Sequence, residues 1–198
     1  MEGVRVVLEE HARGYALAPL YAEPVRTMQR PTPADHHPYF QRYVGRVPEG
    51  DIVELLREGL ETSRELLRTV DEERAEFRYA PGKWTVKELW GHVVDSERIF
   101  GVRCLAIIRG ETYAYPPFDE DAYVKTARFE RRSLADLFAE FEHLRRSHLH
   151  LFAAMDDEEG ARLGWSFGAP IRARSVPWIL AGHEIHHRSV LVERYGLR

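Results

Sequence analysis

Residues 81–100 read PGKWTVKELWGHVVDSERIF, and this stretch decides the fold class. Thr85 can accept a hydrogen bond from the amide three residues on, while Glu88 reaches back to the Thr85 amide, which forms a capping box. Apolar residues then follow at helical spacing up to Gly110, where a glycine favours termination. The stretch therefore predicts a long helix over about 85–109.

Three further segments repeat apolar residues at three- and four-residue spacing, as one buried face of a helix does. They cover about 51–70, 133–155 and 175–195, and their expected N-caps are Asp51, Ser133 and Ser175. Four amphipathic helices of about 20 residues, without a convincing strand pair, predict an all-α four-helix bundle over residues 51–198. The long connections permit either a crossover or a simple up-and-down topology.

Residues 1–50 contain six prolines without sustained apolar periodicity, so we expect an irregular N-terminal arm. A chain of 198 residues with 44% hydrophobic and 30% charged residues is typical of one globular domain. The net charge of -4, with basic and acidic residues interleaved, argues against a nucleic-acid partner. No apolar run reaches the roughly 18 residues of a membrane span. The lone Cys104 and the absence of a signal-peptide core predict a cytoplasmic protein with a buried thiol.

Ten histidines are the unusual feature of the composition. His183 and His187 lie four residues apart, so on a helix both imidazoles can reach one ion. A pair on the helix surface, or a hydrogen-bonded pair in the core, is an equally good interpretation of that spacing alone. His92 lies in the middle of the 85–109 helix, and facing helices of a bundle can supply metal ligands together. We therefore predict one divalent metal ion, zinc or nickel first, with iron, cobalt or manganese also possible.

Other interpretations of the histidines are weaker. The sequence GHEIHH spells the zinc-peptidase motif H-E-x-x-H with Glu184 as base, but Val190 stands where the extended motif needs glycine. His186 is a second choice as ligand, because its partner four residues on would be Val190. His148 is a candidate fourth ligand, although a hydrogen-bonded core histidine is the favoured interpretation.

Residues 81–100, together with AGHEIHHRSVLVERYG at 181–196, resemble the DinB-like superfamily. YFQRYVGRVPEGDI and PPFDEDAYV are similar to it too, so the resemblance covers the chain from about residue 39. It implies an antiparallel four-helix bundle, usually dimeric, with a metal bound by a histidine of the second helix and a His-x-x-x-His pair of the fourth. Those positions are His92, His183 and His187 here. The superfamily includes transferases that join low-molecular-weight thiols such as bacillithiol or mycothiol to electrophiles, so the resemblance implies a homodimeric thiol S-transferase.

Three neutral imidazoles would leave the ion's charge uncancelled and a position open for a thiol cosubstrate. The electrophile is expected under an aromatic loop that contains Tyr113, Tyr115, Phe118 and Tyr123, unless these rings only pack. Asp95 and Glu88 are expected to orient ligands or move protons, and Arg103 to bind a substrate carboxylate. For Asp95, a salt bridge within the helix is an equally good interpretation. The rival functions are a metal-dependent hydrolase and a non-catalytic metal-binding protein.

Overall fold

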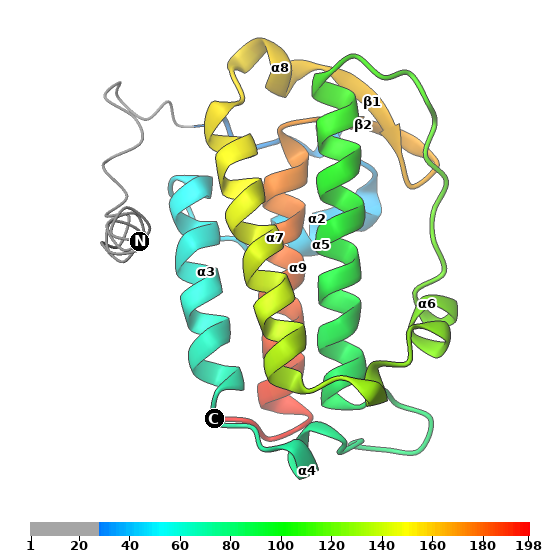
Figure 1. Cartoon of the computed structure of the whole chain (residues 1–198). Coiled ribbons are helices and arrows are strands. Elements are labelled where there is room, and N and C mark those ends of the chain that lie inside the picture. The colour runs from blue at the N-terminus through cyan, green and yellow to red at the C-terminus, as the bar shows by residue number, and fades with distance from the viewer. Residues whose placement is uncertain (1–27) are drawn as a thin grey trace, which may run out of the picture.

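The computed structural model describes residues 28–198, whose body is a bundle of four long helices (Figure 1). These are α3 (Ile52–Leu67), α5 (Val86–Ile108), α7 (Leu134–Ala154) and α9 (Ser175–Glu193). The predicted caps stand at three of the four starts. The Asp51 carboxylate accepts from two amides of α3, Thr85 and Glu88 form their capping box, and the Ser133 hydroxyl accepts from the Asp136 amide. The predicted four-helix bundle is confirmed.

The start of α9 differs from the prediction, and the cap assigned to Ser175 is wrong. The N-cap position belongs to Arg174, and its side chain makes no capping hydrogen bond. The Ser175 hydroxyl instead donates to the Asp35 carbonyl over 3.1 Å, and the Arg174 guanidinium donates to the Asp35 carboxylate over 3.0 Å. The Ser175 hydroxyl, which the local sequence assigned to the helix cap, is therefore bonded to a carbonyl 140 residues away.

The four helices do not alternate in direction. In Figure 1, α3 and α9 run downward while α5 and α7 run upward, because the segment after α5 returns along the outside of the bundle. Around the bundle the order is α3, α7, α5, α9, so the connections from α3 to α5 and from α7 to α9 cross the diagonal. This is the crossover topology. The antiparallel arrangement implied by the family resemblance is wrong for two pairs of neighbours that run parallel, α5 with α7 and α3 with α9.

Shorter elements surround the bundle. They are η2 (Pro33–Asp35), η3 (Pro38–Phe40), α2 (Gln41–Val44), α4 (Glu72–Ala75), α6 (Glu120–Ala127), η4 (Phe129–Arg131) and α8 (Asp157–Ala161). Of the expected N-terminal arm, residues 1–27 lie outside the described residues. Residues 28–50 contain three of these short turns and contribute Phe40, Tyr43, Val44 and Val47 to the core. The helices of the described part are all too short or too polar to cross a membrane.

The structure contains a small β-hairpin that the all-α prediction did not include. Strands β1 (Leu163–Ser166) and β2 (Ala169–Arg172) pair antiparallel between α8 and α9. Phe167 and Gly168 join them with φ of 59° and 73°, which is the two-residue turn that suits the twist of a hairpin. Four-residue strands, one of them with Pro170 inside, carry too little alternation to be recognised from sequence.

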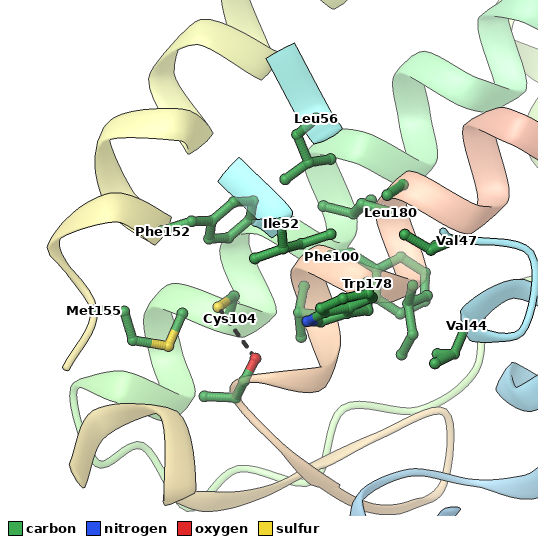
Figure 2. Packing of buried hydrophobic residues seen from close by; sticks show 14 of the residues in the cluster. Val44, Val47, Ile52, Leu56, Phe100, Cys104, Phe152, Met155, Trp178 and Leu180 are labelled. Carbon is green, nitrogen blue, oxygen red and sulfur yellow. Dashed lines mark hydrogen bonds between the residues drawn. The ribbon is translucent and has the colours of Figure 1, made fainter. Parts of the chain in front are cut away.

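The core is divided into two apolar halves by a polar layer. One half gathers around Phe100, Cys104 and Trp178, as Figure 2 shows, and the other around Trp90 and Phe141. Cys104 is fully buried, with its thiol 3.9 Å from the Ala173 carbonyl oxygen, so its predicted place in the core is confirmed. Between the halves, α5, α7 and α9 each carry buried polar side chains, which include the predicted metal ligands.

Candidate metal centre

Three histidines from two helices converge within the polar layer. The Nε2 atom of His183 lies 3.1 Å from Nε2 of His92 on α5 and 3.1 Å from Nε2 of His187, one turn further along α9. All three side chains are buried. Each can offer one nitrogen to a common point, since these atoms lie within 4.8 Å of one another. The structure thus brings together the three residues predicted as metal ligands.

The chemistry of these three nitrogens fits a divalent cation. An imidazole nitrogen carries either one proton or one lone pair, so Nε2 of His183 cannot make a normal hydrogen bond to both neighbours at once. With metal–nitrogen bonds of about 2.1 Å, two nitrogens on one ion are about 3.0 Å apart at an octahedral angle and about 3.4 Å apart at a tetrahedral one. The observed 3.1 Å falls between these values.

The electrostatic environment keeps the cluster neutral. Burial, and secondarily the nearby His186, lower the pKa of His92 to about 4. Burial, followed by the other histidines, lowers the pKa of His183 and His187 well below 6.5. At neutral pH all three rings are therefore in the neutral form, and each keeps one nitrogen lone pair for a metal ion.

Aromatic packing orients two of the rings. Trp84 lies 5.0 Å from the His92 ring and Tyr43 lies 5.2 Å from the His183 ring, measured between centroids. Tyr43 can approach so closely because α9 has glycine at position 182. A Cβ atom on Gly182 would lie 2.0 Å from the Tyr43 carbonyl oxygen. The backbone of α2 therefore rests directly on α9, one residue before His183.

A cleft opens onto the cluster beside His92 and His183. Its other lining residues are mainly aromatic: Tyr39, Phe40, Tyr43, Ser96, Phe100, Phe118, Glu120, Phe167 and Ile179. A second hollow reaches His187 from the side of Tyr79, Trp84 and Tyr195. Of the aromatic loop predicted to overhang the site, Phe118 lines the cleft. Tyr113 and Tyr123 are largely exposed, and Tyr113 packs edge-on against Tyr115.

The other predicted site residues have partners elsewhere. Glu88 completes the α5 capping box and accepts from Arg78 over 2.5 and 3.0 Å. Asp95 is half-buried; burial and then Glu140 raise its pKa, and its charged neighbours are on α5, α7 and the segment before α7. Arg103 donates to the Ser166 hydroxyl over 3.1 Å and to the Pro116 carbonyl over 2.8 Å. Within residues 28–198, these three side chains make no hydrogen bond to the histidines.

A buried ion network that the sequence analysis missed lies on the other side of α9. Arg145 is completely buried and donates to Glu97 over 2.8 and 2.9 Å and to Glu184 over 2.6 Å. Glu184 also accepts from Ser63 and Arg188. The motif glutamate is therefore bound to arginine and serine rather than available as a base, which supports the rejection of the peptidase interpretation. The available signal was the phase of Arg145, four residues after the buried Phe141.

Two other histidines, His148 and His186, lie close to the cluster or to its neighbours. His148 shares a hydrogen bond of 3.0 Å with the Glu97 carboxylate, so it is the bonded core histidine that was favoured. His186 is partly buried, its ring 5.0 Å from His187 and 5.7 Å from Tyr43, and it does not belong to the group of three.

Comparison with known proteins agrees with this fold. Residues 55–191 match the family model of the DinB superfamily. None of the curated protein sequences matches the chain. Among solved structures, YfiT from Bacillus subtilis, described as a probable metal-dependent hydrolase with an unusual four-helix bundle topology, has a TM-score of 0.61 at 18% identity, covering 86% of this chain and 95% of its own.

Two further structures are similar. The mycothiol-dependent maleylpyruvate isomerase has a TM-score of 0.59 at 17% identity, over 73% of this chain and 61% of its own length. The present chain thus spans less than two thirds of that enzyme. A DinB-like protein, YjoA from Bacillus subtilis, has a TM-score of 0.53 at 18% identity, over 74% of this chain and 90% of its own. At these identities the likeness shows a shared fold.

Proposed function

The chain belongs to the DinB superfamily, and from that premise we propose that it is a metal-dependent enzyme joining a small thiol to an electrophile. His92, His183 and His187 would hold one divalent ion, zinc or nickel first, with iron, cobalt or manganese as alternatives. The observation that carries the proposal is the convergence of three neutral Nε2 atoms at an aromatic cleft. When bound, the ion would supply a Lewis-acid position that favours the thiolate form of a thiol.

The protein's own residues prepare this position. Tyr43 and Trp84 hold two of the rings, and burial keeps the imidazoles unprotonated. The aromatic walls of the cleft offer apolar surface to an electrophile. Glu120, on the exposed first turn of α6, is the one carboxylate that lines this cleft among the described residues. Such a site suits a nucleophile that can lose its proton without help from a buried general base. A thiol does this more readily than water, which favours thiol chemistry.

Hydrolysis is the second candidate, because YfiT is described as a probable metal-dependent hydrolase and shares the fold. In that case the open position would serve a water molecule. The mycothiol-dependent isomerase also shares the fold, over 73% of this chain, and supports the thiol reaction. The two candidates use the same three histidines, so the choice of nucleophile separates them.

Metal analysis tests the site itself. We expect about one divalent ion per chain in the wild type and little in His92→Ala, His183→Ala or His187→Ala. His186→Ala is the matched control, because it removes a neighbouring imidazole outside the group of three, and it should retain its metal. Equal metal content in all five proteins would refute the site.

Activity assays then separate the two reactions. Metal-loaded protein is incubated with a panel of small thiols plus a model electrophile, and separately with activated esters and amides. A thioether product that disappears on chelation supports the transferase. Hydrolysis with no thioether product would favour the hydrolase over the transferase. Inactivity in both assays would favour a metal-binding role without catalysis.

A further inference from the structure

An arginine stands beside the aromatic cleft without a carboxylate of its own. The guanidinium carbon of Arg42, on α2, lies 3.7 Å from the centroid of the Tyr39 ring and 5.0 Å from that of Tyr43. Both tyrosines line the cleft that opens onto His92 and His183. Among residues 28–198, no carboxylate oxygen lies within 4.0 Å of the Arg42 guanidinium, whereas Arg145 and Arg174 are each bonded to buried acids.

The position of Arg42 is fixed by the fold. The Tyr43 carbonyl rests on Gly182, and the Arg30 guanidinium donates to the carbonyls of Val44 and Val47, both over 2.9 Å. These contacts clamp α2 against α9. The arginine is exposed, yet the tyrosine rings beneath it restrict where its guanidinium can lie, and stacking of this kind is favourable for arginine.

The distance from Arg42 to the metal site suits a small molecule. The Tyr43 ring lies 5.0 Å from the guanidinium and 5.2 Å from the His183 ring, so the guanidinium is at most about 10 Å from that imidazole. The partly buried His186 is also close to Tyr43, with 5.7 Å between their ring centroids. A ligand whose reacting atom reaches the three histidines would therefore meet a cation at its other end.

We propose that Arg42 is a binding residue for an anionic group, a carboxylate or a phosphate, on the ligand that occupies the three-histidine site. The inference rests on the proposed function, because it assigns one end of the thiol cosubstrate. A guanidinium binds carboxylates and phosphates alike through paired hydrogen bonds, so the proposed group is an oxyanion and the choice between the two is left to experiment. Arg103, which was expected to bind a substrate carboxylate, has its donors directed at Ser166 and Pro116 instead.

A matched pair of thiols tests the inference. 3-Mercaptopropionate and 3-mercaptopropanol differ by a carboxylate against a hydroxyl, and each is titrated into cobalt-loaded protein while the sulfur-to-cobalt absorption band is followed. We expect wild type to bind the acid about tenfold more tightly than the alcohol, which corresponds to about 1.4 kcal/mol. Arg42→Gln should abolish that preference and leave affinity for the alcohol unchanged. Arg57→Gln, an exposed arginine on α3, is the control and should behave as wild type.

The outcomes separate this inference from the proposed function. If the band appears but Arg42→Gln retains the preference for the acid, the inference is overturned and the thiol site stands. If no thiol produces a band, the proposed function fails, and Arg42 is then tested by titrating succinate and inorganic phosphate into metal-free protein followed by NMR. Chemical-shift changes around α2 that vanish in Arg42→Gln support an anion site, and the stronger ligand distinguishes carboxylate from phosphate. Their absence in wild type refutes it.

Discussion

Replacement of Arg145 by methionine should strongly destabilise the protein. Its guanidinium, 0% exposed, links three other helices through Glu97 on α5, Glu184 on α9 and the Leu56 carbonyl on α3. Removal of one partner from a buried ion network costs about 3–5 kcal/mol, because the remaining charges are left without compensation. That loss is a large part of the 5–15 kcal/mol that typical domains have.

The loss should arise mainly at Glu97. Glu184 keeps hydrogen bonds from Ser63 and Arg188 when Arg145 is removed, whereas Glu97 keeps only its contact with His148. Burial raises the pKa of Glu97, but the charge and hydrogen bonds of Arg145, followed by those of His148, more than offset this and lower it to about 2. Without Arg145, burial would dominate and the carboxyl would become easier to protonate than in the unfolded chain. The stability deficit of Arg145→Met should therefore shrink as the pH falls.

Urea denaturation of metal-free protein measures both effects, with the free energy of unfolding compared at equal m-value. Addition of Glu97→Gln to Arg145→Met should recover part of the loss, because a neutral amide replaces the uncompensated charge. Arg146→Met is the control: its side chain is 51% exposed and pairs with Glu142, so it should cost less than about 1 kcal/mol. A loss for Arg145→Met no larger than this control would refute the reasoning.

Four further predictions concern the site and the core. Gly182→Ala should cost about 1–3 kcal/mol by overpacking and weaken metal binding, since its Cβ would meet the Tyr43 carbonyl; urea denaturation and metal titration measure both. Metal-free protein should lose stability as pH falls from 6.5 to about 4, by about 3 kcal/mol from His92 alone, because the unfolded chain binds the proton first; denaturation of His92→Gln at several pH values should show a smaller loss, with the contributions of His183 and His187 remaining. Cys104, whose pKa burial raises to about 12, should react with a thiol reagent only on unfolding. Light scattering should give twice the chain mass of 23.0 kDa, and a monomer mass would contradict the proposed homodimer.

Local signals in the sequence account for what was predicted correctly. The apolar spacing of residues in α3, α5, α7 and α9 is set by the helix period, and the caps at Asp51 and Thr85 act within three residues. The spacing of His183 and His187 follows from the same period. His92 could be added because it lies in the middle of a helix and facing helices of a bundle can supply ligands together, and the family resemblance assigned the same residue.

Contacts between distant segments account for what was missed. The parallel run of α5 and α7 depends on the path of residues 110–133, which no local pattern specifies. The Ser175 hydroxyl binds a carbonyl 140 residues away, and Gly182 matters only because Tyr43 lies against it. Arg103 and Glu88 were chosen by helical phase, and the roles expected of them stay predictions. Phase gives the side of a helix, but it does not tell which loop or arginine will take the side chain's hydrogen bonds.

The charges around α9 explain why the site should select an anionic ligand. The two buried acids near the histidines are Glu97 on α5 and Glu184 on α9. Arg145 and Arg188 pair with them, so the polar layer of the core contributes almost no net charge. The metal ligands themselves are neutral imidazoles, and a divalent ion bound by them would keep its full charge. Buried carboxylates that would otherwise satisfy the ion are bound to arginines on the far side of the helix. Glu120, on the exposed first turn of α6, is the one carboxylate of the described residues that lines the cleft, so an incoming anion would supply the remaining compensation, and the proposed role of Arg42 would add to that attraction.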